Sequence, residues 1–258
     1  MVVDISYGSL FLILILLLPG ILIEKYFKLG LLKSSTISIF RMYFQLSLIG
    51  IYLQYIFVYN NSIINILYLC IMIIAASFST INTVGLKSKA FLVIFIPMLI
   101  LIFSFSLFFN MIILKTGLFE AKYLIPISGM ILGNCLNTSI ISLTSFLSIF
   151  KNRKKEYLYT LSLGASKLEA LKPYMAESIS LSLRPAIATM ATLGIVKLPG
   201  MMTGQILAGN LPITAIKYQI AVMVLIFGAQ MYNAFLILIL ASRFFFDDYM
   251  LPRENLMK

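Results

Sequence analysis

The chain has 258 residues, of which 61% are hydrophobic and 11% are charged, and its mean hydropathy is +1.01. A soluble domain is about half apolar and about a quarter charged, and one core in a chain of this size would not bury the excess apolar surface. These values exclude a water-soluble enzyme and a disordered chain, and they indicate a membrane protein. Because membrane topology also governs where Lys and Arg lie, the net charge of +11 does not by itself predict a nucleic-acid partner, and we expect none.

The sequence offers few side chains for metal, redox or catalytic chemistry. It contains no His, and its two cysteines, Cys70 and Cys135, lie far apart. The usual ligand sets of zinc and the paired cysteines of a disulfide framework are therefore missing. The nine acidic residues lie at or outside the ends of the apolar runs, and there is no HExxH, GxSxG or GxxxxGK[ST] motif. We expect a non-catalytic chain that binds no cofactor of its own.

Seven apolar runs are long enough to cross a membrane, because a helix needs about 20 such residues to span a hydrocarbon core of roughly 30 Å. They are Ile5–Ile23, Ile37–Val58, Ile63–Ile81, Ala90–Ile112, Tyr123–Leu147, Ser178–Leu198 and Tyr218–Leu240. The expected fold is all-α, a single transmembrane helical bundle over residues 1–258 with about seven spans. The first run has no basic start and no A-x-A exit, so we interpret it as a retained span and not as a cleaved signal.

The distribution of Lys and Arg predicts the orientation of these spans, because cytoplasmic loops hold the excess of basic residues. With the N-terminus outside, fourteen basic residues fall on the cytoplasmic side and four on the outer side, while Arg41 and Arg184 lie within spans. The four outer residues are Lys115, Lys122, Lys197 and Lys217. We therefore expect an outer N-terminus and a cytoplasmic C-terminus. The richness in Ile, Asn, Lys, Phe and Tyr suggests an AT-rich genome, which favours a bacterial inner or cytoplasmic membrane.

One long polar segment, residues 148–177, lies between the fifth and sixth runs on the predicted cytoplasmic side. Its pattern is helical apart from Gly164 and Pro173, and Ser166 is placed to cap a second helix after Gly164. Leucines at helical spacing give the segment an apolar stripe with basic flanks, formed by Leu158, Leu161, Leu168 and Leu171. Two interpretations fit this stripe: a segment that rests on lipid headgroups, or a helix that docks into a groove on a cytoplasmic partner.

A first segment of small residues, SGMILGNCLNTS, lies in the fifth run. Gly129 and Gly133 are four residues apart, which leaves one helix face bare and allows a neighbouring helix to approach closely. Asn134 and Asn137 lie beside them, and amide groups in hydrocarbon must find hydrogen bonds, so they are expected to face the bundle or a water-filled cavity. The segment is therefore either a packing face or part of a substrate path.

A second segment, LPGMMTGQILAGNLP, extends from Leu198 to Pro212. Its prolines and glycines argue against a straight spanning helix and predict a bent outer loop or a re-entrant turn. Gly200 and Gly204 repeat the four-residue spacing of a packing face. Met201, Met202 and Gln205 are candidates for a substrate path, since thioether sulfur binds soft metal ions, although methionines in apolar sequence more often only pack.

Two arginines lie within predicted spans. Arg41 is near the inner end of the second span and can extend to the headgroups. Arg184 lies about two turns into the sixth span, immediately before Pro185, which is expected to loosen the helix one turn earlier. Glu177 is placed on the same face, where it could pair with Arg184 in part. A role for Arg184 in the substrate path or gate and simple extension to the headgroups are both open.

Four stretches of the sequence, YLIPISGMILGN, LSLGASKLEALKPYM, GIVKLPGMMTGQILAG and AIKYQIAVM, resemble the FetB-type ABC transporter permeases. These are iron-export permeases related to the plant aluminium-tolerance half-transporters, and the similarity extends from about Met1 to Arg243. The resemblance implies a permease subunit that pairs with a separate ATPase, which would bind ATP and magnesium, in an assembly of two permeases and two ATPases. It also implies that the segment with Leu163, Gly164 and Ala165 is the coupling helix, with Leu161, Leu168 and Leu171 around it.

The sequence alone leaves two other classes to compare with an ABC permease. A self-powered carrier or channel would need ionisable groups at the middle of the membrane, and no Asp, Glu or His lies at the centre of any span. A seven-span receptor fits the topology, but a retinal Schiff base would need a Lys deep in the last span, where there is none. The expectation of iron as cargo comes from the resemblance alone, because the chain lacks the carboxylates and imidazoles that divalent cations prefer.

Overall fold

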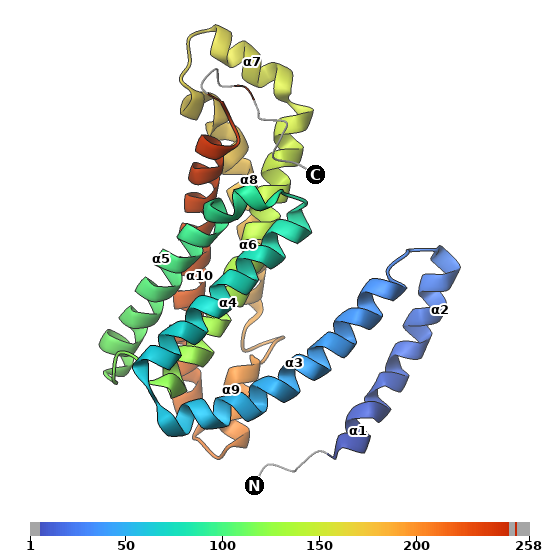
Figure 1. Ribbon diagram of the computed structural model, residues 1–258, viewed down its shortest axis with the longest axis vertical. Coiled ribbons are helices and arrows are strands. Elements are labelled where there is room, and N and C mark those ends of the chain that lie inside the picture. Colours follow the sequence, from blue (N-terminus) through green and yellow to red (C-terminus); the bar gives the residue numbers. More distant parts are fainter. Residues whose placement is uncertain (1–5, 248–250, 252–258) are drawn as a thin grey trace.

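The structure, a computed structural model, describes residues 6–247 and 251, and the helices among them form a bundle with no β-strand. Figure 1 shows their arrangement. In chain order the elements are α1 (Tyr7–Leu12), η1 (Ile13–Leu17), α2 (Leu18–Phe27), α3 (Leu32–Tyr59), α4 (Ser62–Val84), η2 (Ser88–Ala90), α5 (Phe91–Phe108), η3 (Phe109–Leu114), α6 (Ala121–Asn152), α7 (Lys154–Ser162), α8 (Lys167–Thr192), α9 (Gly200–Leu207) and α10 (Pro212–Phe244). The predicted all-α fold is confirmed.

Six helical stretches of the described chain are long and apolar enough to cross a membrane. They are Gly8–Phe27, Leu32–Tyr59, Ser62–Val84, Ser88–Leu114, Ala121–Asn152 and Pro212–Phe244, and they overlap or contain the predicted spans one to five and seven. Ile5, with which the first predicted span starts, lies outside the described residues. In each of these cases the length of the apolar run was sufficient to predict the helix, with its ends shifted by a few residues.

The sixth predicted span differs from the structure. α8 has 26 residues but is less apolar than the other long helices, and it ends at Thr192, six residues before the predicted end at Leu198. The helix continues through Pro173 and Pro185, so the break expected at Pro173 is absent. Residues 193–199 and the two-turn helix α9 complete the return of the chain to the start of α10 (Figure 1). With α8, seven long helical stretches of the described chain run along the molecule, and α8 is the most polar of them.

Local chemistry sets several helix ends. Asn60 ends α3 in a left-handed conformation, and the Asn61 side chain caps α4 by accepting a hydrogen bond from the Ile63 N–H at 2.9 Å. Gly85 ends α4 with φ of +79°, a conformation that favours glycine. The predicted cap at Ser166 is confirmed, because its hydroxyl accepts from the Glu169 N–H while its own N–H donates to the Glu169 carboxylate.

Two groups of elements mark the opposite ends of the molecule (Figure 1). α7 and the end of α10 lie at one end, which we call the α7 end, and the α3–α4 turn and α9 lie at the other, which we call the α9 end. The α4–α5 turn and the α2–α3 turn lie between these ends. α6 has 32 residues, or about 48 Å of helix, so it exceeds a hydrocarbon core of roughly 30 Å. The α7 end therefore projects beyond a bilayer that covers the apolar middle of the bundle.

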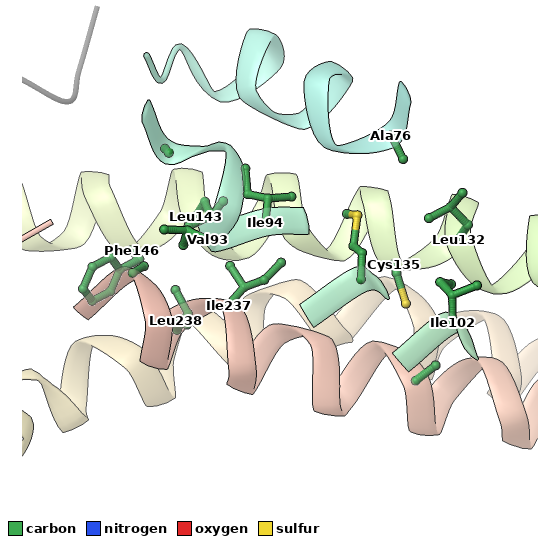
Figure 2. Close-up of a cluster of buried hydrophobic side chains, with 14 of the residues drawn as sticks. Ala76, Val93, Ile94, Ile102, Leu132, Cys135, Leu143, Phe146, Ile237 and Leu238 are labelled. Carbon is green, nitrogen blue, oxygen red and sulfur yellow. The ribbon is translucent and has the colours of Figure 1, made fainter. Parts of the chain in front are cut away.

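The core lies between α4, α5, α6 and α10. Figure 2 shows Ala76 of α4, Ile94 and Ile102 of α5, Cys135 of α6 and Ile237 of α10 in this cluster. Inside a bilayer the lipid tails are as apolar as these side chains, so close packing and polar contacts between helices hold the bundle together more than the hydrophobic effect does.

The hairpin of α1, α2 and α3 stands away from the bundle (Figure 1). Only the last turns of α3 pack on it, through Ile56, which is buried against Ala121 and Ile125 of α6. Near the start of α3, Tyr43 instead contacts α1, where its hydroxyl donates to the Leu10 carbonyl at 2.7 Å. The hairpin is thus a separate arm attached at the α9 end.

Candidate translocation path and coupling segment

The exposed side chains of the bundle are of two kinds. On α4, α5 and α10 the exposed residues in the middle of each helix are mostly large and apolar, which suits contact with lipid. They include Leu67, Ile71, Ile74 and Phe78 of α4, Leu92, Ile96, Ile100 and Phe108 of α5, and Ile220, Val224, Met231 and Phe235 of α10. α6 and α8 differ, because their exposed stripes are made largely of small and polar residues.

The stripe on α6 follows steps of three or four residues and therefore lies on one side of the helix. Gly133, Asn137, Thr144 and Ser148 are exposed, and the apolar Ile141 between them is half-buried. The predicted path residue Asn137 lies in this stripe. Asn134 is half-buried beside it, and its amide nitrogen donates to the Met130 carbonyl at 2.8 Å within the same helix.

The stripe on α8 continues the polar surface of α6. It contains Glu177, Ser180, Arg184, Ala188 and Ala191, all exposed and again three or four residues apart. The two stripes adjoin because Arg153, which follows α6, forms an ion pair with Glu177 at 3.1 Å. Glu177 is thus paired with Arg153, and the predicted pairing of Glu177 with Arg184 is wrong.

Arg184 lies near the middle of the bundle. Ile179 lines a groove together with Phe235 of α10, and Met190 lines a cavity together with Met223 of α10. Arg184 lies between Ile179 and Met190 along α8, so it is roughly level with residue 230 of the 33-residue helix α10. This depth favours a functional role over extension to the headgroups, because charged groups in the membrane interior face a protein or water-filled space.

We call the two stripes together the α6–α8 polar face, defined by Gly133, Asn137, Thr144 and Ser148 of α6 and by Glu177, Ser180 and Arg184 of α8. Amide, hydroxyl and guanidinium groups exposed at membrane depth would lose their hydrogen bonds in lipid. The polar face is therefore covered by water or by protein when the chain is in a membrane, which is the environment of a solute path.

A cavity of about 620 Å³ opens at the α9 end of this face. Pro126 and Met130 of α6 line it, and they precede Gly133 on the same helical stripe, so the cavity leads directly into the polar face. The other lining residues are Lys122, Tyr123, Ile127, Met201, Gln205, Asn210, Thr214 and Tyr218. The structure thus brings the predicted residues Met201 and Gln205 into one cavity with Pro126 and Met130 of α6, whereas the predicted residues Asn134 and Asn137 do not line it.

Met202 lies elsewhere. It lines a second cavity of about 440 Å³ between α8, α9 and α10, together with Met190, Met223 and Gln219. Adjacent residues of a helix point about 100° apart, so Met201 and Met202 face different spaces and do not form one thioether site. Within the described residues there is also no group of three His, Cys, Asp or Glu side chains that could hold a metal ion.

A seam of buried polar residues joins α6 to α10. Asn233 is buried, and its amide nitrogen donates to the Ser139 hydroxyl at 2.7 Å and to the Cys135 carbonyl at 3.1 Å. One turn away, the Gln230 amide nitrogen donates to the Thr138 hydroxyl at 2.9 Å. These contacts hold the polar face of α6 in a fixed rotation relative to α10. The sequence analysis missed both amides, although two amides three residues apart in an apolar span were a visible signal.

The predicted packing glycines have different surroundings. A Cβ added to Gly129 would lie 3.4 Å from the Met72 side chain of α4, so Gly129 does allow close packing. Added Cβ atoms at Gly133, Gly200 and Gly204 would meet no atom within 4 Å, so these three do not pack against a neighbouring helix within the chain. A close contact that was not predicted occurs at Gly228, where a Cβ would lie 3.1 Å from the Phe105 ring.

The coupling segment forms an elbow between α7 and α8 at the α7 end (Figure 1). Gly164 stands at the bend with φ of +89°, which is rarely adopted by residues with a side chain. The predicted leucine stripe is not one surface, because Leu171 is fully buried and Leu161 packs against the core. The exposed leucines of the elbow are Leu163, at 71%, Leu168, at 50%, and Leu158 of the predicted stripe, at 38%, and Ala165 beside the bend is half-buried.

A capping box stabilises the second arm of the elbow. The Ser166 hydroxyl donates to the Glu169 carboxylate at 2.6 Å, and the Ser166 N–H donates to the same oxygen at 2.8 Å. These two hydrogen bonds favour the ionised carboxylate and lower the pKa of Glu169 from its ordinary value. α8 therefore begins at a fixed position immediately after the bend.

An aromatic cluster connects the elbow to the long helices. The Phe150 ring of α6 has its centroid 5.2 Å from that of Tyr157 of α7, 6.1 Å from that of Tyr174 of α8 and 5.1 Å from that of Phe246, which follows α10. Burial raises the pKa of Tyr157 to about 12, with a smaller contribution from Asp247. Because Tyr157 of α7 packs in this ring cluster, a displacement of α7 would be transmitted directly to the ends of α6, α8 and α10.

Comparison with known proteins agrees with this architecture. The profile of the family described as "Uncharacterised protein family (UPF0014)" matches residues 7–246. The chain belongs to the UPF0014 family. A UPF0014 membrane protein of Bacillus subtilis, YjkA, is 33% identical over 84% of this chain and 86% of its own length. No solved structure matches the chain.

Two further relatives of this UPF0014 chain have functional names. The Escherichia coli protein named "Probable iron export permease protein FetB" is 30% identical over 95% of this chain and 94% of its own length. "Protein ALUMINUM SENSITIVE 3" of Arabidopsis thaliana is 29% identical over 84% of this chain and 78% of its own length. The predicted family resemblance is thus confirmed, and the chain is a polytopic protein of a membrane.

Proposed function

We propose that this UPF0014 chain is the permease subunit of an ABC transporter, a non-catalytic membrane subunit driven by a separate ATP-binding subunit. The observation that supports this most strongly is the elbow at Gly164. It presents Leu163 and Leu168 beyond the apolar bundle, and the aromatic cluster around Phe150 ties it to α6 and α8, which carry the polar face. An ATPase that moves the elbow would therefore move the walls of the path.

The partner would supply the nucleotide chemistry. The sequence has no GxxxxGK[ST] loop, so ATP and magnesium would bind to the partner ATPase and not to this chain. In this arrangement the α7 end is cytoplasmic. The α7 end holds more basic residues than the α9 end, including those of the α7–α8 segment, which agrees with the excess of Lys and Arg on cytoplasmic sides.

The polar face supports an assembly of two permeases with two ATPases. A single chain leaves Asn137 and Arg184 exposed at membrane depth, and a second copy that presents the same face would enclose them. The solute would then pass between the two polar faces, and lipid would contact the apolar outer sides of α4, α5 and α10. The direction of transport is export, and iron is the candidate cargo by analogy with the named bacterial relative.

The test measures association of the permease with candidate ATP-binding cassette ATPases from the same organism. Leu163→Glu and Leu168→Glu place a charge on the elbow without touching the core, and each should abolish copurification of the ATPase and ATP hydrolysis that depends on the permease. Leu29→Glu is the matched control, because Leu29 is also an exposed leucine, at 55%, but lies in the α2–α3 turn, away from the elbow. Unchanged association in both elbow variants, or nucleotide-independent transport by the permease alone, would refute the proposal.

A further inference from the structure

The charge around the outer cavity is positive. Lys122 lines the cavity, and the other lining residues are neutral side chains with hydroxyl, amide, thioether or hydrocarbon groups. The basic residues that the structure describes at the α9 end are Lys115, Lys122, Lys197 and Lys217, and the acidic residue described there is Glu120. Four lysines against one glutamate give the α9 end a net positive charge, although it holds fewer basic residues than the α7 end.

The backbone adds to the positive electrostatic potential at the outer cavity. α6 begins at Ala121, so its first turn, which carries Lys122, lies at the rim of the cavity. The N-terminal end of a helix bears a partial positive charge from its aligned peptide dipoles. The Ala121 N–H is already bound to the Asn60 side chain at 2.9 Å, but the dipole of a 32-residue helix remains directed at the cavity. Lys122 and the N-terminal end of α6 therefore both make the potential in the cavity more positive.

The charge along the interior of the proposed path is also positive. Arg184 is the ionisable residue of the polar face that lies near mid-depth, and Glu177, the acid of that face, is neutralised by Arg153 nearer the α7 end. The remaining groups of the face are amides and hydroxyls, which hydrogen-bond to solutes without adding charge. Two polar faces brought together would place two Arg184 side chains along one path.

These features do not suit a bare divalent cation. Hard cations prefer several carboxylate oxygens, and transition metals add imidazole or thiolate ligands. The described residues contain no cluster of three such groups, and the cavity lining contains none at all. A cation that entered the outer cavity or passed Arg184 would meet positive charge without a compensating ligand.

We propose that the cargo occupies this path as an anion that carries carboxylate or phosphate groups, either free or as an anionic complex of a metal, and not as a bare metal cation. Lys122 and the start of α6 hold its negative groups in the outer cavity. Tyr123, Gln205 and Tyr218 provide hydrogen-bonding groups for its polar parts, and Arg184 pairs with it at mid-depth. This inference rests on the proposed permease function, and it specifies the chemical class of the substrate.

The test is binding to the purified full-length permease in lipid nanodiscs, without the ATPase, measured by calorimetric titration. The probes are citrate, inorganic phosphate, ferric citrate, Fe²⁺, Mn²⁺ and Ag⁺, each added separately. Citrate or phosphate alone would identify a free anion as the ligand, and a clear preference for ferric citrate would identify the metal complex. Lys122→Gln should weaken anion binding at least tenfold, and Lys122→Glu should abolish it.

Lys217→Gln is the matched control, because Lys217 is exposed at the same end but does not line the cavity, and it should leave anion binding within twofold of the wild type. The inference is overturned if no anion binds, if Lys122→Gln binds anions as well as the wild type does, or if Fe²⁺, Mn²⁺ or Ag⁺ binds alone while the anions do not. Any of these results leaves the ATPase association test unaffected, so the two proposals fail independently.

Discussion

At the scale of single residues, the contact between Asn233 and Ser139 provides a direct test of the seam between α6 and α10. Removing either partner by Asn233→Ala or Ser139→Ala eliminates the 2.7 Å hydrogen bond. Polar contacts between membrane helices contribute about 0.6 kcal/mol on average and up to about 1.7 kcal/mol. Because Asn233 is fully buried, we expect a coupling free energy in the upper part of that range from a double-mutant cycle on detergent-solubilised protein.

The control cycle combines Asn233→Ala with Ser106→Ala. Ser106 is also buried, but its hydroxyl bonds with Ser128, 2.8 Å away, and not with Asn233. The two substitutions in this pair should therefore add within the error of the measurement. Equal coupling in both cycles would mean that the seam is not the specific link between the two helices.

Single-residue inferences from the sequence succeeded where one local rule decided the outcome. The cap at Ser166 and the bend at Gly164 were predicted because they depend on residues within one turn. The pairing of Glu177 was predicted wrongly because helical periodicity identifies residues on one face but not partners on another helix. Gln230 and Thr138 are 92 residues apart, and no pattern within either span indicates that they meet.

At the scale of elements, the exposed stripe of α6 makes a testable claim about Gly133. An added Cβ at this position would meet no atom within 4 Å, so Gly133→Leu should not destabilise the chain, and loss of a helical glycine should raise its stability by about 0.5 to 1 kcal/mol. The leucine side chain would fill the space through which we propose that solute passes. We expect normal expression and an unreduced melting temperature but a loss of cargo-stimulated ATP hydrolysis by the reconstituted complex.

Ala75→Leu on α4 is the comparison for Gly133→Leu, because Ala75 is a small exposed residue on a helix whose other exposed side chains are mostly apolar. This variant should retain both stability and activity. If the two variants behave alike, Gly133 faces lipid and the stripe is not part of a path.

Helices that coincide with long apolar runs were predicted correctly from the sequence, and the amphipathic helix α8 was not. Long apolar runs predicted six helices, because a run of about 20 apolar residues has few alternatives in a membrane. Both ends of α8 were predicted wrongly, because the helix is apolar on its buried side and polar on its exposed side. Its average hydropathy is therefore low, and hydropathy alone does not locate where the helix begins and ends. The glycines and prolines around α9 predicted a bent segment there, but they predicted neither the two-turn helix nor its contacts with α10.

At the scale of the whole molecule, the question is what packs against the α6–α8 polar face, which a single chain leaves exposed. If a second copy covers it, a cysteine on this face of one permease lies opposite the same cysteine of the other. Ala188→Cys, introduced into a chain whose Cys70 and Cys135 are replaced by Ser and Ala, should form a covalent dimer with a short thiol-specific cross-linker in native membranes. Ala188 is suitable because it is small and exposed, and lies one turn from Arg184.

Val224→Cys is the matched control, since Val224 is 67% exposed on the side of α10 that the second copy would leave in contact with lipid. It should give no dimer under the conditions that cross-link Ala188→Cys. ATP and the partner ATPase should change the extent of cross-linking at Ala188, because movement of the elbow displaces α8 through Tyr174 and Phe150. Efficient cross-linking at Val224 with none at Ala188 would place the interface on α10, and the polar face would then need cover from the α1–α3 arm or from another protein.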